Sequence, residues 1–67
     1  MKNNIRDIRK KMKISQEDLA NKCSVTRQTI NAIENDKYDP TLSLAFKLSI
    51  HLETTVDQLF TFEGDTK

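Results

Sequence analysis

Residues that form crosslinks, bind metals or interrupt helices are scarce in this chain of 67 residues. It has one cysteine, one histidine, one proline and one glycine, and it has no tryptophan. One cysteine forms no internal disulfide, and one cysteine with one histidine cannot supply the ligands of a structural zinc site. No apolar run approaches the roughly 20 residues of a membrane span, and the first residues lack the apolar segment of a signal peptide. We therefore expect a cytoplasmic protein without membrane contacts, metal or other cofactors.

The positive charge is concentrated in one half of the chain. The net charge is only +1, but residues 1–37 hold nine Lys and Arg against five Asp and Glu, whereas residues 38–67 hold two against five. A polyanion would meet the N-terminal half. A chain this short has room for one small core, so capped helices or dimerisation must stabilise it. The sequence predicts a single domain over 1–67.

Helix start signals recur five times. In each, a side-chain oxygen can accept a hydrogen bond from the free N–H groups of a helical first turn. The predicted caps are Asn4, Ser15, Thr26, Thr41 and Thr55. Ser15 with Asp18, and Thr55 with Gln58, have the spacing of capping boxes. With no convincing internal strand, the sequence predicts an all-α fold of five short helices.

The periodicity of two of these helices predicts their environment. The first has Ile5, Ile8 and Met12 on one face, so its basic residues are expected outside, and these are Arg9, Lys10, Lys11 and Lys13. The fourth, after Pro40, is apolar on most of its circumference and is expected to be central. In the second helix, Cys23 is expected to be a small core residue rather than a redox sensor.

Residues 15–35 have the organisation of a helix-turn-helix, in which one helix crosses the phosphate backbone and the next enters the major groove. With Ile30 and Ile33 inward, the outward face of the second of these helices carries Gln28, Asn31 and Asn35, with Ala32 beside them and Arg27 at its edge. Amides can pair with adenine through both amide atoms, Arg with guanine, and an Ala methyl can contact thymine. Gln16, which opens the first of the two helices, can donate to a phosphate. The composition favours binding to double-stranded DNA.

Three stretches of the sequence carry a family resemblance, S-Q-E-D-L-A, then V-T-R-Q-T-I-N-A-I-E-N-D-K-Y-D-P-T-L, and finally V-D-Q-L-F. With them the sequence resembles the lambdoid repressor and Cro family, also called the XRE family. The resemblance covers 4–60 and leaves a tail of 61–67. It implies a five-helix, lambda-repressor-like domain and a transcriptional regulator, expected to be a repressor acting as a homodimer on a two-fold operator. With this resemblance, the expected base contacts are Arg27, Gln28, Thr29, Asn31 and Ala32. The expected phosphate contacts are Gln16, Thr26, Asn35, Lys37 and Tyr38.

Three positions depart from the pattern of the family, which often has glycine there. They are Ser24, Asp36 and Glu53. Such positions often need a positive φ, which favours glycine. We therefore expect local strain at these residues rather than a change of function.

The C-terminal region suggests a dimer interface made by Val56, Leu59, Phe60 and Phe62. The competing interpretation is that Leu59 and Phe60 close the core of the monomer. In some relatives the termini also pair as short strands, here over 2–4 and 61–63.

Two other classes of function compete with DNA binding for this sequence. One is a protein-interaction module or an antitoxin-like protein that binds a partner, and a separate regulatory protein is a possible partner of the regulator too. The other is an enzyme, which has no support because no nucleophile and base pair can be assembled. Glu34 is expected to be a helix-end or ion-pair partner rather than a base reader.

Overall fold

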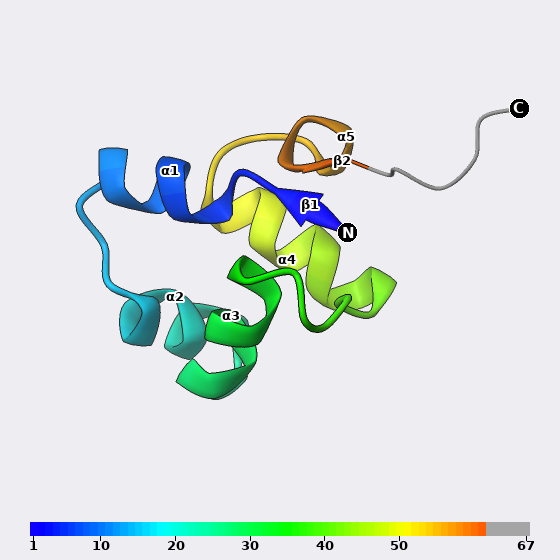
Figure 1. The fold of residues 1–67 in the computed structure, drawn as a ribbon. Helices are drawn as coiled ribbons and strands as arrows, with labels where there is room; N and C mark the ends of the chain where they lie inside the picture. Colours follow the sequence, from blue (N-terminus) through cyan, green and yellow to red (C-terminus); the bar gives the residue numbers. More distant parts are fainter. Residues whose placement is uncertain (62–67) are drawn as a thin grey trace, which may run out of the picture.

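A computed structural model describes residues 1–61, which form five α-helices and two short strands (Figure 1). The order is β1 (Lys2–Asn3), α1 (Ile5–Lys11), α2 (Gln16–Cys23), α3 (Arg27–Glu34), α4 (Leu42–His51), α5 (Val56–Leu59) and β2 (Phe60–Thr61). The predicted five-helix fold is confirmed. Helix α4 runs through the middle of the molecule, with α2 and α3 on one side of it and α5 and the strands on the other.

The helix starts follow the predicted capping, except that the Asn4 side chain does not cap α1 and the capping box predicted at Thr55 and Gln58 is half formed, because the Gln58 Oε1 accepts from Thr54. Ser15 and Asp18 form a complete capping box, and Thr26, Thr41 and Thr55 each accept from the N–H three residues later. Asn4 is the N-cap residue of α1, as predicted, but its side chain makes no capping hydrogen bond. Its side-chain nitrogen donates instead to the carbonyl of Gln58, 3.1 Å away, and the Oδ1 of Asn3 accepts from the N–H of Ile5 at 3.1 Å.

Four of the helices end in the same way, on a residue with a positive φ. The φ angles of Ser24, Asp36 and Glu53 are 61°, 61° and 58°, as expected from the family pattern, and Lys13 adds a fourth at 61°. In each case the next N–H donates to the carbonyl five residues before it, as from Ile14 to Arg9 and from Val25 to Ala20. This is the hydrogen bond of the Schellman motif, in which glycine is the favoured residue. A side chain there costs about 1–2 kcal/mol.

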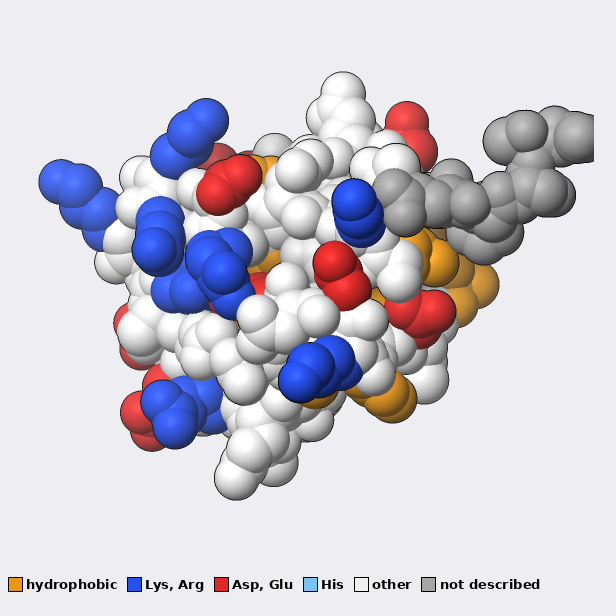
Figure 2. All heavy atoms as spheres, in the orientation of Figure 1, with side chains coloured by type: hydrophobic (Ala, Val, Ile, Leu, Met, Phe, Trp, Pro, Cys, Tyr) orange, Lys and Arg blue, Asp and Glu red, His pale blue; other side chains and the backbone are white. Residues whose placement is uncertain are grey.

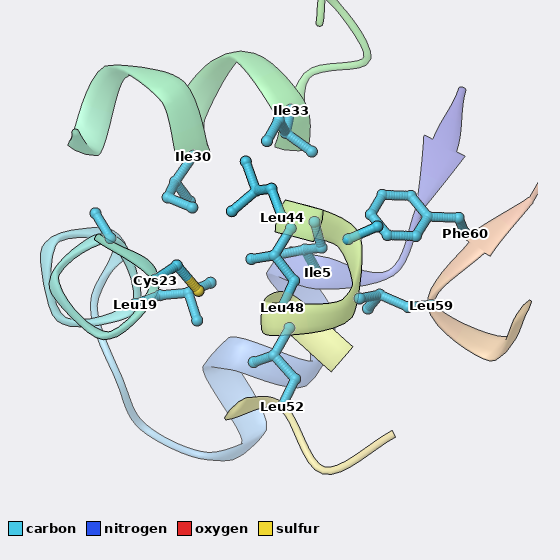
Figure 3. Close-up of a cluster of buried hydrophobic side chains, with 12 residues drawn as sticks. Ile5, Leu19, Cys23, Ile30, Ile33, Leu44, Leu48, Leu52, Leu59 and Phe60 are labelled. Carbon is cyan, nitrogen blue, oxygen red and sulfur yellow. The ribbon is translucent and has the colours of Figure 1, made fainter. Parts of the chain in front are cut away.

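The core lies between α4 and the other helices (Figure 3). Leu44 and Leu48 of α4 and Leu52 after it face α2 and α3 on one side and Leu59 and Phe60 on the other. Cys23 is buried there, as predicted, and burial raises the pKa of its thiol while the charge of Lys47 lowers it less. The thiol is therefore a core group rather than a reactive one.

Helix α4 is less enclosed than its composition predicts. Three of its large apolar side chains point away from the core, with exposed fractions of 69% for Leu42, 52% for Phe46 and 69% for Ile50. They recur every four residues and so form one ridge along the helix. The predicted central position of α4 is confirmed, but one face stays uncovered, because the small domain has no further element to cover it among residues 1–61.

The two termini pair as an antiparallel ribbon. Lys2 is opposite Thr61 and Asn3 is opposite Phe60. The predicted pairing of the ends is thus confirmed, but β2 begins one residue earlier than expected, at Phe60. Leu59 is fully buried and Phe60 nearly so, which confirms the interpretation that they close the core of the monomer. The expectation that these two side chains offer exposed apolar surface is wrong; Val56 is half-buried and Phe62 lies outside the described residues.

Candidate nucleic-acid interface

Helices α2 and α3 are joined by three residues and pack closely against each other. The turn is made by Ser24, whose left-handed backbone ends α2, and by Thr26, whose side chain caps α3. Ile30 and Ile33 of α3 are buried in the core. The arrangement holds the opposite side of α3 outward, as the spacing of the two isoleucines predicts.

The outward face of α3 carries amide and guanidinium groups. The exposed side chains are Arg27, Gln28, Asn31 and Asn35, and Thr29 and Ala32 are half-buried. A hollow of about 150 Å³ opens here, lined by Gln16, Arg27, Gln28 and Asn31. None of the four lining side chains is acidic, so the hollow suits the electronegative edge of a base or a phosphate oxygen.

The acidic residue of α3, Glu34, is turned inward and neutralised. Its side chain has no exposed surface, and the guanidinium of Arg9 donates to it through Nε at 2.8 Å and Nη2 at 3.3 Å. Arg6 donates from Nε at 3.4 Å and Gln16 from Nε2 at 2.9 Å. The ion-pair role predicted for Glu34 is confirmed. The placement predicted for Arg9 is wrong, because this pairing draws it out of the basic surface into the interior.

These contacts set the pKa of Glu34. Burial alone would raise it, but the hydrogen bonds from Arg9, Gln16 and Arg6 and the charge of Arg9 together outweigh burial and lower it. The carboxylate therefore stays ionised and fully satisfied behind α3. The outward face of the helix is left without negative charge.

The surface around these helices is positively charged in part. Figure 2 shows Lys and Arg side chains gathered over the α1 side of the molecule and apolar side chains at the opposite edge. This separation follows the uneven charge of the two halves of the sequence. The gathered basic side chains lie over α1, and the surface over α2 and α3 carries only scattered ones.

A family described as helix-turn-helix matches residues 5–59 of the chain. The chain belongs to this helix-turn-helix family. An HTH-type transcriptional regulator from Methanocaldococcus jannaschii is 46% identical over 65 residues, which cover 97% of this chain and 98% of the relative. The HTH-type transcriptional regulator YgzD of Bacillus subtilis is 38% identical, with 97% and 98% covered. The helix-turn-helix protein is therefore a transcriptional regulator and not an enzyme, and such regulators bind double-stranded DNA.

Solved structures agree with this assignment. The restriction-modification controller protein C.AhdI of Aeromonas hydrophila superposes with a TM-score of 0.78 at 26% identity, covering 85% of this chain and 86% of that one. The N-terminal DNA-binding domain of SinR from Bacillus subtilis gives 0.78 at 25% identity, covering 92% and 91%. The lambda-repressor-like fold predicted from the sequence is confirmed. Within 1–61, no helix is long and apolar enough to cross a membrane, and no cluster of three His, Cys, Asp or Glu suits a metal ion.

The phosphate-contacting residues expected from the resemblance lie at both ends of the helix-turn-helix. Lys37 and Tyr38 are exposed just after α3, and the hydroxyl of Thr26 caps α3 and lies 3.0 Å from that of Thr29. The side chains of Gln16 and Asn35 are already engaged. Both N–H groups of the Gln16 amide have acceptors, on Glu34 at 2.9 Å and on Asn31 at 3.3 Å. The Asn35 amide donates to the backbone carbonyl and the Oδ1 of Asn31, at 2.9 and 3.2 Å.

Two arginines of α1 were missed as part of this region. Arg9 lies four residues after Ile5 and three before Met12, so the helical spacing that identified the apolar face could have identified it as inward. Arg6 had no such signal. The fold alone brings its Nη2 to 3.0 Å from the Oδ1 of Asn35, at the end of the helix-turn-helix.

The helix-turn-helix protein is expected to lose stability in acid through Glu34. Its pKa in the folded state is below the ordinary 4.5, so its contribution is complete above that value and is lost as the pH falls through the lower, folded pKa. Urea unfolding between pH 7 and pH 3 should show a steeper fall for the wild type than for Glu34→Gln. If the two curves stay parallel through this range, the ionised carboxylate contributes nothing.

Proposed function

We propose that this regulator is a repressor that reads a two-fold operator as a homodimer in the cytoplasm. The observation that carries the proposal is the outward face of α3, on which amides and Arg27 surround a hollow while the acid of the helix is buried. Base contacts are assigned to Arg27, Gln28, Thr29, Asn31 and Ala32. Repression needs no further surface, because a protein seated on an operator excludes other proteins from it.

Phosphate contacts are proposed at the two ends of the helix-turn-helix. Thr26, Lys37 and Tyr38 keep the roles that the family resemblance implies. Gln16 would contribute the free backbone N–H at the start of α2, since its side-chain donors are occupied. Beside Asn35, whose donors are also occupied, the half-exposed guanidinium of Arg6 has N–H groups left for a phosphate.

The homodimer is supported by the ridge of Leu42, Phe46 and Ile50 on α4. Beside it lies an apolar pocket of about 250 Å³, lined by Met1, Pro40, Leu42, Ala45, Val56 and Phe60. Such surface would be buried if the ridge packed against its own copy across a two-fold axis. One α3 reaches only a few base pairs, whereas two copies read half-sites about 34 Å apart. Of the interface residues predicted from the sequence, Val56 and the nearly buried Phe60 line this pocket.

Selection of bound sequences from a random duplex pool tests the DNA-binding proposal. We expect a pseudo-palindrome with half-sites about one helical turn apart. A promoter carrying that site should be transcribed less in the presence of the protein. If no sequence is enriched, the proposal fails; an enriched site without symmetry removes the dimer from it.

Sedimentation equilibrium at micromolar concentration separates the homodimer from the second candidate function. A protein-interaction module or an antitoxin-like protein would use the same ridge of α4 for a different protein. A dimer in this experiment supports the homodimer proposal, and a folded monomer contradicts it. In that case the ridge would belong to a separate regulatory protein.

Gln28→Ala is expected to weaken binding to the selected operator by about 1–3 kcal/mol, because the exposed amide can pair with a base edge. Binding to unrelated duplexes should change much less. Asn21→Ala removes an exposed amide from α2 to which no contact is assigned, and it is the matched control. Fluorescence anisotropy on labelled duplexes measures both. Unchanged operator affinity in Gln28→Ala would show that the reading face is assigned wrongly.

Binding should weaken steeply with salt although the net charge is only +1. Each phosphate that is neutralised contributes about −0.9 to the slope of log K against log salt concentration. Lys37→Gln should therefore reduce the slope by about that amount, while Lys47→Gln, on α4, should leave it unchanged. A flat response in the wild type would contradict the argument from charge distribution.

A further inference from the structure

The polar side chains around α3 form a closed ring of hydrogen bonds. Arg6 donates to Asn35 at 3.0 Å and to Glu34 at 3.4 Å, and Gln16 donates to Glu34 at 2.9 Å. Gln16 and Asn35 both donate to the same acceptor, the Oδ1 of Asn31, at 3.3 and 3.2 Å. The side-chain oxygen of Asn31 therefore accepts two hydrogen bonds from within the protein.

The orientation of each amide in the ring is fixed by a partner that permits no alternative. The ionised carboxylate of Glu34 only accepts, so the atom of Gln16 beside it must be the nitrogen. Arg6 only donates and a backbone carbonyl only accepts, so Asn35 must place its oxygen toward Arg6 and its nitrogen toward Asn31. With donors approaching from both sides, the ring atom of Asn31 must be its oxygen. The assignment thus follows from the network rather than from the shape of the amide.

The nitrogen of Asn31 has a different environment. No hydrogen bond within residues 1–61 uses its Nδ2, and Asn31 is exposed at the hollow that it lines with Gln16, Arg27 and Gln28. An oxygen lone pair offered to DNA would have to be taken from Gln16 or Asn35. The two N–H groups of Nδ2 are free without any such loss.

We propose that Asn31 reads its base only as a hydrogen-bond donor and therefore prefers guanine to adenine. This inference rests on the proposed function. Guanine presents two acceptors, O6 and N7, to the major groove, whereas adenine presents the N7 acceptor beside the N6 donor. The usual pairing of an asparagine with adenine needs the amide oxygen as well as the nitrogen, and here the oxygen is engaged. Thymine offers one acceptor, O4, and cytosine only a donor.

Gln28 provides an internal comparison. It lies on the same face of α3 and lines the same hollow, but no hydrogen bond within the described part of the chain involves its side chain. Both atoms of its amide are available, so it can pair with adenine through both. The two amides of one helix are therefore expected to read different bases.

The first test selects operators with three proteins, the wild type, Asn31→Ala and Asn31→Asp. Asn31→Ala should lose its base preference at one operator position. At that position the wild type should select guanine over adenine by about tenfold. Asn31→Asp keeps an oxygen in the ring but turns a second oxygen toward DNA, so the preference at that position should reverse toward cytosine or adenine. Gln28→Ala, the control, should relax a different position.

A second test frees the oxygen of Asn31 without changing the residue. In the double variant Gln16→Ala/Asn35→Ala both donors are gone, and adenine should become acceptable at the Asn31 position. Should this variant fail to fold, replacing the guanine by 7-deazaguanine tests the same contact from the DNA side. The loss of N7 should weaken binding by the wild type and leave Asn31→Ala unaffected.

Two results overturn the inference while leaving the proposed function intact. One is a wild-type preference for adenine at the position that Asn31→Ala relaxes, and the other is a selected operator in which Asn31→Ala relaxes no position. If no duplex is enriched by any of the proteins, the proposed function itself fails, and the inference fails with it. The pattern of enriched sequences thus tells the two failures apart.

Discussion

Glu34→Ala is expected to lower the free energy of unfolding by about 3–5 kcal/mol, because it leaves the guanidinium of Arg9 buried without a counter-ion. The side chain of Arg9 is only 11% exposed, so water cannot replace the lost carboxylate. Gln16 loses an acceptor at the same time. Small domains have total stabilities of about 5–15 kcal/mol, so a large part of the folded state would be lost. Urea unfolding followed by circular dichroism at pH 7 measures the change.

Two controls separate burial from pairing in this experiment. Arg6→Ala removes a half-exposed partner of the same carboxylate and should cost no more than about 1 kcal/mol. The double variant Arg9→Met/Glu34→Leu removes both charges and should be more stable than Glu34→Ala, since no unpaired charge remains. A loss below about 1 kcal/mol in Glu34→Ala would mean that the pair contributes little to the fold.

If the proposed dimer forms through the apolar ridge of α4, removing the ridge is expected to give a monomer and to weaken operator binding roughly 10²–10³-fold, since the two half-sites are then bound independently. Phe46→Gln/Ile50→Gln achieves this with two side chains that are more than half exposed and so contribute little to the monomer's core. Sedimentation equilibrium measures the dimer, and anisotropy on the selected operator measures binding.

The matched control for the ridge is Lys47→Gln, which introduces the same residue on the neighbouring flank of α4, outside the ridge of Leu42, Phe46 and Ile50 and close enough to Cys23 for its charge to act on that thiol. It should remain dimeric and bind the operator as the wild type does. Binding of the ridge variant to a duplex with one half-site should equal that of the wild-type monomer, because the helix-turn-helix itself is unchanged. A ridge variant that is still dimeric would place the interface elsewhere.

The local parts of the molecule could be predicted because their determinants lie close together in the chain. A cap joins residues three apart, so Ser15, Thr26 and Thr41 could be placed from the sequence. The inward direction of Ile30 and Ile33 similarly fixed which residues of α3 face outward, and with them most of the candidate site. The positive φ angles at Ser24, Asp36 and Glu53 were expected only through the resemblance to a family that has glycine there.

Contacts between distant residues were predicted less well, because they depend on where whole helices come to rest. The side chain of Asn4 does not cap α1, because it donates to the carbonyl of Gln58, which is 54 residues away. Arg9 was expected in solvent because nothing in α1 shows that a carboxylate of α3 will lie beside it. The exposure of Phe46 and Ile50 could not be predicted from an apolar helix, since composition does not show how many elements remain to cover it.

The sequence by itself determined the five helices, the helix-turn-helix and the amide-bearing face of α3, because helical periodicity and capping act over three or four residues. Only the tertiary structure decided how those amides are used. It joined Arg6 of α1 and Gln16 of α2 to Glu34 of α3 and to Asn35 just after it, and so engaged the oxygen of Asn31 within the protein and left its nitrogen without a partner among residues 1–61. The physical reason is that a hydrogen bond needs its two atoms within about 3 Å, and only the packing of three helices brings these residues that close.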